Sequence, residues 1–135
     1  MKKLLILALL LFSLTSYAQT ITTQQLFCLG RPIDAVKRSV PDGYKYVKTS
    51  EGFLLYKNAK GNVIGYEFDD KNNCKSVATQ MPITKMKPVE AKLATEYRLY
   101  EDMYYTNPGH PHMYYTGTVG KTLAMLVATK NLINF

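Results

Sequence analysis

The chain has 135 residues, of which 47% are hydrophobic and 20% are charged, and its formal net charge at neutral pH is +7. This length fits one domain and allows a hydrophobic core that folds without a structural metal or a dense set of disulfides. The lysines are scattered and the arginines do not cluster, so the composition argues against a nucleic-acid-binding protein. The positive charge is explained either by a lysine-rich surface that only contacts solvent or by attraction to acidic glycans or an anionic outer surface.

The first eighteen residues have the three-part layout of a secretory signal peptide. Lys2 and Lys3 form a basic start, residues 4–14 form an apolar run, and residues 16–18 supply small side chains before a cleavage site. The apolar run is shorter than the roughly 20 residues that a membrane-spanning helix requires. We therefore expect export to the periplasm or beyond it. The mature domain, residues 19–135, would carry a charge of +5 because Lys2 and Lys3 are removed, and it contains no further apolar run that could span a membrane.

Two cysteines remain in the mature chain, Cys28 and Cys74. In an oxidising compartment an even number of cysteines favours a disulfide, which would stabilise the fold by roughly 4 kcal/mol on the chain-entropy model. The alternative is a pair of separate buried thiols, which pack as small hydrophobic side chains. The sequence leaves both alternatives open.

The mature chain begins with two short segments before the first clear strand. Residues 20–29 are apolar and β-branched, and we interpret them as a first strand or an extended arm. Residues 31–40 place Ile33 and Val36 on one helical face, with Pro32 in the first turn, and they predict a short helix.

Four short runs rich in β-branched and aromatic residues follow, and turn-forming residues separate them. The runs are residues 44–49, 53–58, 63–68 and 74–81. This pattern predicts a four-stranded antiparallel meander. Alternation in the third run puts Ile64, Tyr66 and Phe68 on one side, so one face of the sheet is apolar and requires a cover.

Residues 88–104 are expected to provide that cover. Apolar and tyrosine residues recur there at spacings of three and four, which is the pattern of an amphipathic helix of about four turns. Pro88 suits the first helical position. Tyr97 and Tyr100 are expected to pack on this helix rather than to bind a ligand.

Gly120-Lys121-Thr122 has the ending of a phosphate-binding loop, but the spacing is wrong. That motif requires four residues between its first glycine and the Gly-Lys-Thr, and Gly117 leaves only two. Because β-favouring residues flank Gly120, we predict a hairpin with a two-residue turn that pairs Thr118 with Leu123, and no nucleotide site. The hairpin strands are residues 113–119 and 122–129.

Together these elements predict one α+β domain. Its antiparallel sheet has about six strands, from the four-stranded meander and the C-terminal hairpin, and one short and one longer helix pack on one face.

Tyrosine is the most unusual feature of the composition, with eleven tyrosines and no tryptophan. Exposed tyrosines combine an apolar ring with a polar tip and favour recognition, although packing is the alternative for each of them. Two tyrosine pairs flank a short loop that contains both histidines. We take these six residues as a candidate binding site: Tyr104, Tyr105, His110, His112, Tyr114 and Tyr115.

The sequence contains no motif that points to a catalytic centre, a metal or a cofactor. There is no zinc-protease or serine-hydrolase signature, and Glu67 is the one carboxylate on a predicted strand face that could take part in chemistry. His110 and His112 are the two histidines that could transfer protons near neutral pH. We therefore expect a non-catalytic binding or accessory module for an envelope or extracellular protein, a peptide or a glycan. The alternative is a small exported enzyme that uses His110 and His112.

Overall fold

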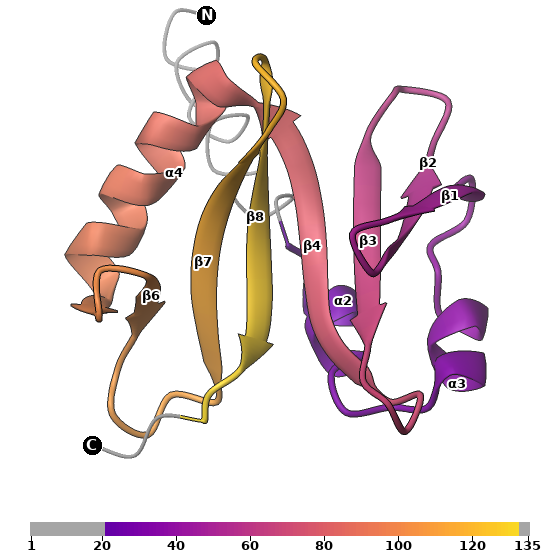
Figure 1. Ribbon diagram of the computed structural model, residues 1–135, viewed down its shortest axis with the longest axis horizontal. Coiled ribbons are helices and arrows are strands. Elements are labelled where there is room, and N and C mark those ends of the chain that lie inside the picture. Colours follow the sequence, from indigo (N-terminus) through magenta and orange to yellow (C-terminus); the bar gives the residue numbers. More distant parts are fainter. Residues whose placement is uncertain (1–20, 133–135) are drawn as a thin grey trace, which may run out of the picture.

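The computed structural model describes residues 21–132, so the predicted leader lies outside the described residues. These residues form one antiparallel sheet of eight strands with three helices (Figure 1). The order across the sheet is β1 (Lys45–Ser50), β2 (Phe53–Lys57), β3 (Val63–Phe68), β4 (Cys74–Pro82), β8 (Leu123–Lys130), β7 (His112–Val119), β6 (Tyr104–Thr106) and β5 (Arg98–Tyr100). The predicted α+β class is confirmed, with two more strands and one more helix than expected.

The first helix, α2 (Thr23–Phe27), lies where we predicted an extended segment, so that prediction is wrong. Thr22 and Gln25 form a capping box in which each backbone amide donates to the other residue's side-chain oxygen at 3.2 Å. The Gln25 side chain also donates to the carbonyl oxygen of Ala78 in β4, again at 3.2 Å. These bonds explain why a segment rich in β-branched residues turns into a helix and docks on the sheet.

The short helix predicted next is confirmed as α3 (Ile33–Arg38), with Pro32 at its N-terminal boundary. Val36 is 1% exposed and points into the core, whereas Lys37 and Arg38 lie in the last turn, where they complement the helix dipole. A short antiparallel bridge between Pro32 and Asn73 joins this helix to the start of β4.

The meander and the C-terminal hairpin are confirmed as β1–β4 and as β7–β8. The hairpin register differs from the prediction by one residue, because Val119 pairs with Leu123 and Thr118 pairs with Ala124. The loop therefore contains three residues, Gly120 to Thr122, rather than two. Gly120 has a φ of +68°, a left-handed conformation that glycine adopts without a steric penalty.

The longer helix, α4 (Ile83–Glu96), begins five residues before the predicted start and ends before the predicted end. Pro88 lies inside the helix rather than at its first position. Tyr97 has an extended backbone, and Tyr100 and Tyr104 pair with each other in the β5–β6 hairpin instead of lying on a helix. The helical prediction for residues 97–104 is therefore wrong.

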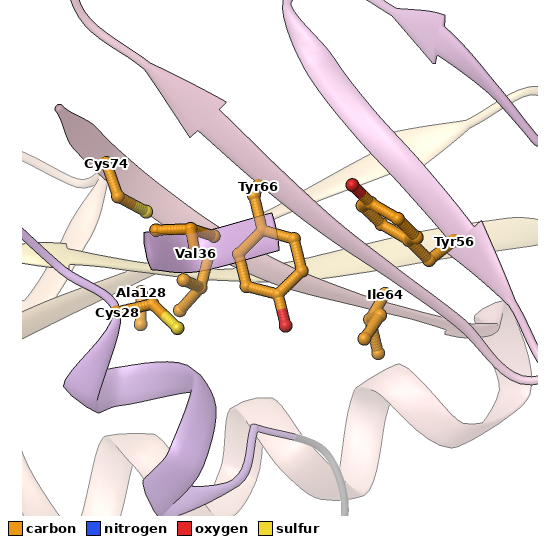
Figure 2. Packing of buried hydrophobic residues seen from close by; sticks show 8 residues of the cluster. Cys28, Val36, Tyr56, Ile64, Tyr66, Cys74 and Ala128 are labelled. Atoms are coloured by element: carbon orange, nitrogen blue, oxygen red, sulfur yellow. The ribbon is translucent and has the colours of Figure 1, made fainter. Parts of the chain in front are cut away.

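All three helices cover the same face of the sheet. The region of α2 and α3 contributes Cys28 and Val36 to a core cluster, which also contains Tyr56, Ile64, Tyr66, Cys74, Val77 and Ala128 (Figure 2). Helix α4 contributes Met86, Val89 and Leu93 to a second cluster with Met81, Ala124 and Leu126. Because Ala124, Leu126 and Ala128 alternate along β8, they point to one face, and both helix groups lie on it.

The opposite side, which we call the uncovered face, carries no helix among the described residues. Phe53, Ala78 and Val127 form a small buried cluster there, surrounded by Leu55, Tyr115 and Met125.

Within residues 21–132 no helix is long and apolar enough to cross a membrane.

Candidate functional site

The six residues of the predicted site lie on β6, β7 and the connection between them, but on two faces of the sheet. Tyr105 and Tyr114 are register partners and pack toward the helices. Tyr115 belongs to the cluster on the uncovered face. Because neighbouring residues of a strand point to opposite sides, each tyrosine pair is divided between the two faces.

A ring cluster lies on the helix-covered face near the end of α4. Tyr97 contacts His110 edge to face, with ring centroids 5.1 Å apart, and Tyr114 with centroids 5.5 Å apart. His110 and His112 have ring centroids 6.0 Å apart. Tyr97, which we expected only to pack on a helix, is thus the residue that joins the predicted site residues His110 and Tyr114.

Hydrogen bonds order these side chains. The His112 amide donates to His110 Nδ1 at 3.1 Å, and the same Nδ1 lies 2.8 Å from the His112 carbonyl oxygen. His110 Nε2 lies 3.4 Å from the Tyr97 hydroxyl oxygen. The Tyr114 ring packs against the Tyr97 ring, which extends the chain of contacts.

Two groups of this cluster are shifted toward their neutral forms. Burial, and secondarily the neighbouring His110, lower the pKa of His112. Burial, and secondarily Tyr97, raise the pKa of Tyr114 to about 12. Within residues 21–132, neither histidine has a hydrogen bond to a carboxylate. The rings and hydrogen bonds therefore form a packed polar cluster at this end of the sheet.

The loop that carries the histidines is held in place by two asparagines. The Asn107 side chain donates to the carbonyl oxygen of Glu96, at the end of α4, at 2.8 Å. The Asn131 side chain donates to the carbonyl oxygen of His110 at 2.7 Å. These bonds join the loop to α4 and to the chain after β8, so the histidine positions depend on two segments that are distant in sequence.

On the uncovered face, Tyr104 and Tyr115 contact each other edge to face with centroids 5.7 Å apart. The Tyr115 phenol is close enough to Ser76 in β4 for the serine to affect its pKa. Burial, and secondarily the carboxylate of Glu67, raise the pKa of the Tyr115 phenol. The Tyr115 ring therefore belongs to a surface that includes side chains from β3 and β4.

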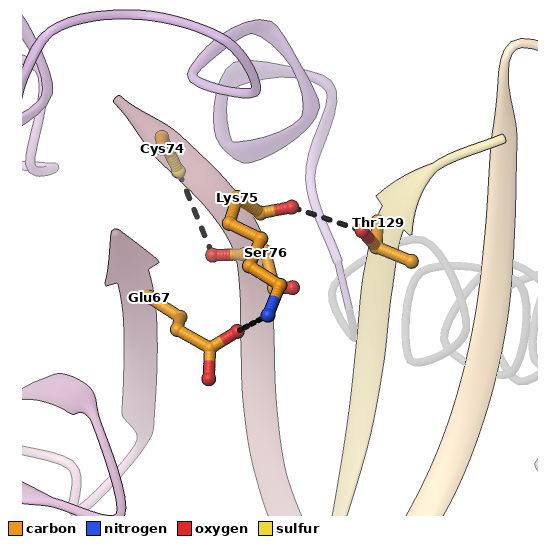
Figure 3. A network of polar contacts seen from close by, with 5 residues as sticks. All are labelled: Glu67, Cys74, Lys75, Ser76 and Thr129. Atoms are coloured by element: carbon orange, nitrogen blue, oxygen red, sulfur yellow. Dashed lines mark hydrogen bonds and ion pairs between the residues drawn. The ribbon is translucent and has the colours of Figure 1, made fainter. Parts of the chain in front are cut away.

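Glu67 is the carboxylate at the β3 end of this surface. Its Oε1 atom lies 3.8 Å from Lys75 Nζ (Figure 3), and the Glu67 side chain is 21% exposed whereas that of Lys75 is 62% exposed. Thr129 Oγ1 donates to the Lys75 carbonyl oxygen at 2.9 Å, which fixes the backbone beside the ion pair.

Sequence reasoning did not identify the aliphatic part of the uncovered face. Leu55 and Met125 are half-buried there beside Tyr115. The alternation of Phe53 and Leu55 with Leu54 and Tyr56 shows that β2 is apolar on both sides. That signal could have indicated a second apolar face.

Cys28 and Cys74 are buried free thiols in this structure. They belong to the same core cluster (Figure 2), and Cys74 exchanges two backbone hydrogen bonds of 2.8 Å with Gly30 and Arg31. Burial raises the pKa of Cys28, and burial, with Cys28 as the second cause, raises the pKa of Cys74 to about 12. The two thiols are therefore close enough for Cys28 to raise the pKa of Cys74.

A surface hollow of about 390 Å³ lies beside Cys28. It is lined by Thr23, Gln24, Phe27, Cys28, Arg31 and Ser39, and it contains none of the six predicted site residues.

No group of three or more His, Cys, Asp or Glu residues in the described part of the chain could hold a metal ion. Comparison of the chain with protein-family models, curated proteins and solved structures gave no match.

Proposed function

We propose that this protein is an exported, non-catalytic binding or accessory module that holds a protein or peptide partner on the uncovered face. The observation that supports this most is the distribution of the helices: all three cover one face, and no described helix covers the other. The uncovered face presents half-buried Leu55, Tyr104, Tyr115 and Met125.

The chemistry of this face favours a polypeptide over a glycan. Besides its tyrosines it offers the aliphatic side chains of Leu55 and Met125, and the apolar surface extends to Val119 and Leu123 at the end of the β7–β8 hairpin, which are 41% and 37% exposed. Large contiguous apolar patches on monomers are rare and commonly mark sites of interaction. Aromatic and methionine side chains are enriched at protein interfaces.

Export is part of the proposal, and it rests on the leader-like residues 1–18. In an oxidising compartment Cys28 and Cys74 would form a disulfide, since they share a core cluster and their chain segments are directly hydrogen-bonded. That bond would join the α2 segment to β4.

The experiment is a pull-down from the envelope fraction of the source organism with mature protein as bait. Tyr104→Ala/Tyr115→Ala alters the uncovered face, and His110→Ala/His112→Ala alters the helix-covered cluster. We expect the first variant to lose the partners that the wild-type protein retains and the second to keep them, provided that circular dichroism shows both variants folded. Retention of all partners by the Tyr104→Ala/Tyr115→Ala variant would exclude this face as the site.

A small exported enzyme that uses His110 and His112 is the second candidate. The contact of Tyr97 with His110 Nε2 at 3.4 Å is the observation that favours it. In that case the His110→Ala/His112→Ala variant would abolish turnover of a substrate, while Tyr104→Ala/Tyr115→Ala would leave it unchanged.

A further inference from the structure

Three lysines gather at the β1 edge of the uncovered face. Lys45 pairs directly with Lys57, and Lys48 pairs with Leu55, which lies on the uncovered face. The register shifts between Tyr46 and Lys48, so that one extra residue is inserted into β1. Without this bulge, Lys45 and Lys48 would point to opposite faces, because side chains alternate along a strand.

The bulge is confirmed by the side chains on the other face. Tyr46 contacts Tyr56 edge to face with centroids 5.9 Å apart, and its hydroxyl lies 2.9 Å from Thr49 Oγ1. Tyr46 and Thr49 therefore share the helix-covered side, three positions apart. Lys45 and Lys48 occupy the uncovered side together with Lys57.

This arrangement of lysines is electrostatically unfavourable in the isolated chain. Like charges directly opposite each other in an antiparallel pair are destabilising. Lys45, Lys48 and Lys57 are exposed, and none of these three lysines has an ion pair within residues 21–132. An acidic group beside Lys45 and Lys48 would relieve the repulsion.

Strand β1 is also an outer strand whose second edge has no strand beside it within residues 21–132. Five of its six residues are exposed, and Tyr46 and Val47 are 56% and 53% exposed. Such an edge presents backbone N–H and C=O groups to which an extended chain can pair.

We infer that the β1 edge binds an acidic, extended segment of a polypeptide partner, which adds a strand to the sheet and places carboxylates beside Lys45 and Lys48. This inference rests on the proposed function, because it names the chemistry of the partner that the module holds. A second copy of this chain does not fit, since pairing two β1 edges would bring the lysine groups of both copies together. The charge of the edge therefore selects an acidic partner.

The test uses fluorescently labelled peptides and the mature protein. A peptide of alternating glutamate and valine is compared with one of alternating lysine and valine, and with one of alternating glutamate and proline. The last peptide has the same acidic charge, but half of its residues lack the N–H donor that strand pairing needs. Fluorescence polarisation measures binding, and amide chemical shifts of β1 report the position.

We expect the glutamate–valine peptide to bind with shifts at Tyr46 and Lys48, and both control peptides to bind about tenfold more weakly or not at all. Lys45→Gln/Lys48→Gln should weaken binding by about tenfold, because the attraction of two exposed charges to the acidic peptide is lost. Lys85→Gln/Lys87→Gln removes two exposed charges from α4 and should change binding less than about twofold.

Equal weakening by the α4 variant, equal binding of the glutamate–proline peptide, or no binding of the glutamate–valine peptide would each overturn the inference. In those cases the lysines and the bulge protect the edge against pairing. The pull-down separates this outcome from a failure of the proposed function. Partners that depend on Tyr104 and Tyr115 but not on Lys45 and Lys48 would overturn only the β1 inference, whereas partners that depend on neither would overturn the proposed function.

Discussion

Leu55 and Gly65 lie directly opposite each other in the β2–β3 pair, and the Leu55 side chain extends over Gly65. A Cβ atom at position 65 would lie 3.0 Å from Leu55 Cδ2 and 3.3 Å from Phe53 Cδ1. Both distances are shorter than a normal carbon–carbon contact, so the two side chains would have to move. The absence of a side chain at Gly65 is therefore what lets Phe53 and Leu55 pack closely on the uncovered face.

Replacing Gly65 with alanine should lower the free energy of unfolding by about 1–3 kcal/mol, because overpacking forces neighbouring side chains from their preferred positions. Urea unfolding followed by circular dichroism measures the change. Gly117→Ala is the matched control, since Gly117 lies in β7 and a Cβ atom there meets nothing within 4 Å. A Gly117→Ala variant that loses as much stability as Gly65→Ala would contradict the packing explanation.

Replacing Thr22 with alanine should destabilise the start of α2 by about 1 kcal/mol, because the capping hydrogen bond to Gln25 is lost. Amide hydrogen exchange of Gln25 and Leu26 is the direct measurement, with urea unfolding as the global one. Thr23→Ala provides the control, since Thr23 is the exposed first residue of α2. Similar exchange rates in both variants would show that the capping box does not hold this helix.

The oxidation state of Cys28 and Cys74 should differ between protein that is secreted to an oxidising compartment and protein that is made in the cytosol. The secreted form is expected to contain the Cys28–Cys74 disulfide, seen as a mass lower by two hydrogens, and reduction should cost about 2–4 kcal/mol of stability. The cytosolic form should react slowly with a thiol-alkylating reagent until it is unfolded, because burial raises the pKa of both thiols and the thiolate is the reactive form. Rapid alkylation of secreted protein under native conditions would contradict the disulfide.

Acidification should destabilise the protein through His112. Its pKa is lowered in the folded state by burial and by His110, whereas in the unfolded state it returns to about 6.5. As the pH falls below about 6.5, the unfolded state takes up a proton more readily than the folded state, and stability decreases until the folded-state pKa is passed. The stability contribution is thus fully present above the unfolded pKa.

Urea unfolding at pH 7.5 and at several lower pH values measures this dependence, and His112→Gln should reduce it because glutamine does not titrate. NMR titration of the His112 ring gives its pKa in the folded state directly. A His112 that titrates at or above its ordinary value would show that burial does not disfavour its charged form.

The strands from Lys45 to Pro82 were predictable because the signal is local. Alternation of side chains and turn residues such as Gly52 and Gly61 determine where each strand begins and ends, and the predicted ranges differ from the observed ones by one residue at most. The register at Gly120 was predicted wrongly by one residue because two-residue and three-residue hairpin loops have similar local sequences. Only the pairing of β7 with β8 distinguishes them.

The errors around Tyr97 have a different cause. Tyr97, Tyr100 and Tyr104 continue the helical spacing of Val89 and Leu93, so their pattern matches a helix. Each of the strands β5 and β6 has only three residues, too few for alternation to be recognised, and their stability comes from pairing with each other and with β7. Near the N-terminus, Thr22 and Gln25 have the spacing of a capping box, which indicates the start of a helix. The β-branched residues around them favoured the incorrect prediction of an extended segment.

The sequence by itself determined that neighbouring residues such as Tyr114 and Tyr115 must separate to opposite faces, because a strand alternates with period two. Only the tertiary structure decided which of those faces the helices cover. That choice depends on contacts between distant residues, such as the bond from Gln25 to Ala78 and the pairing of Ser76 with Thr129. Local periodicity carries no information about such contacts, since their free energy arises only when the whole sheet is assembled.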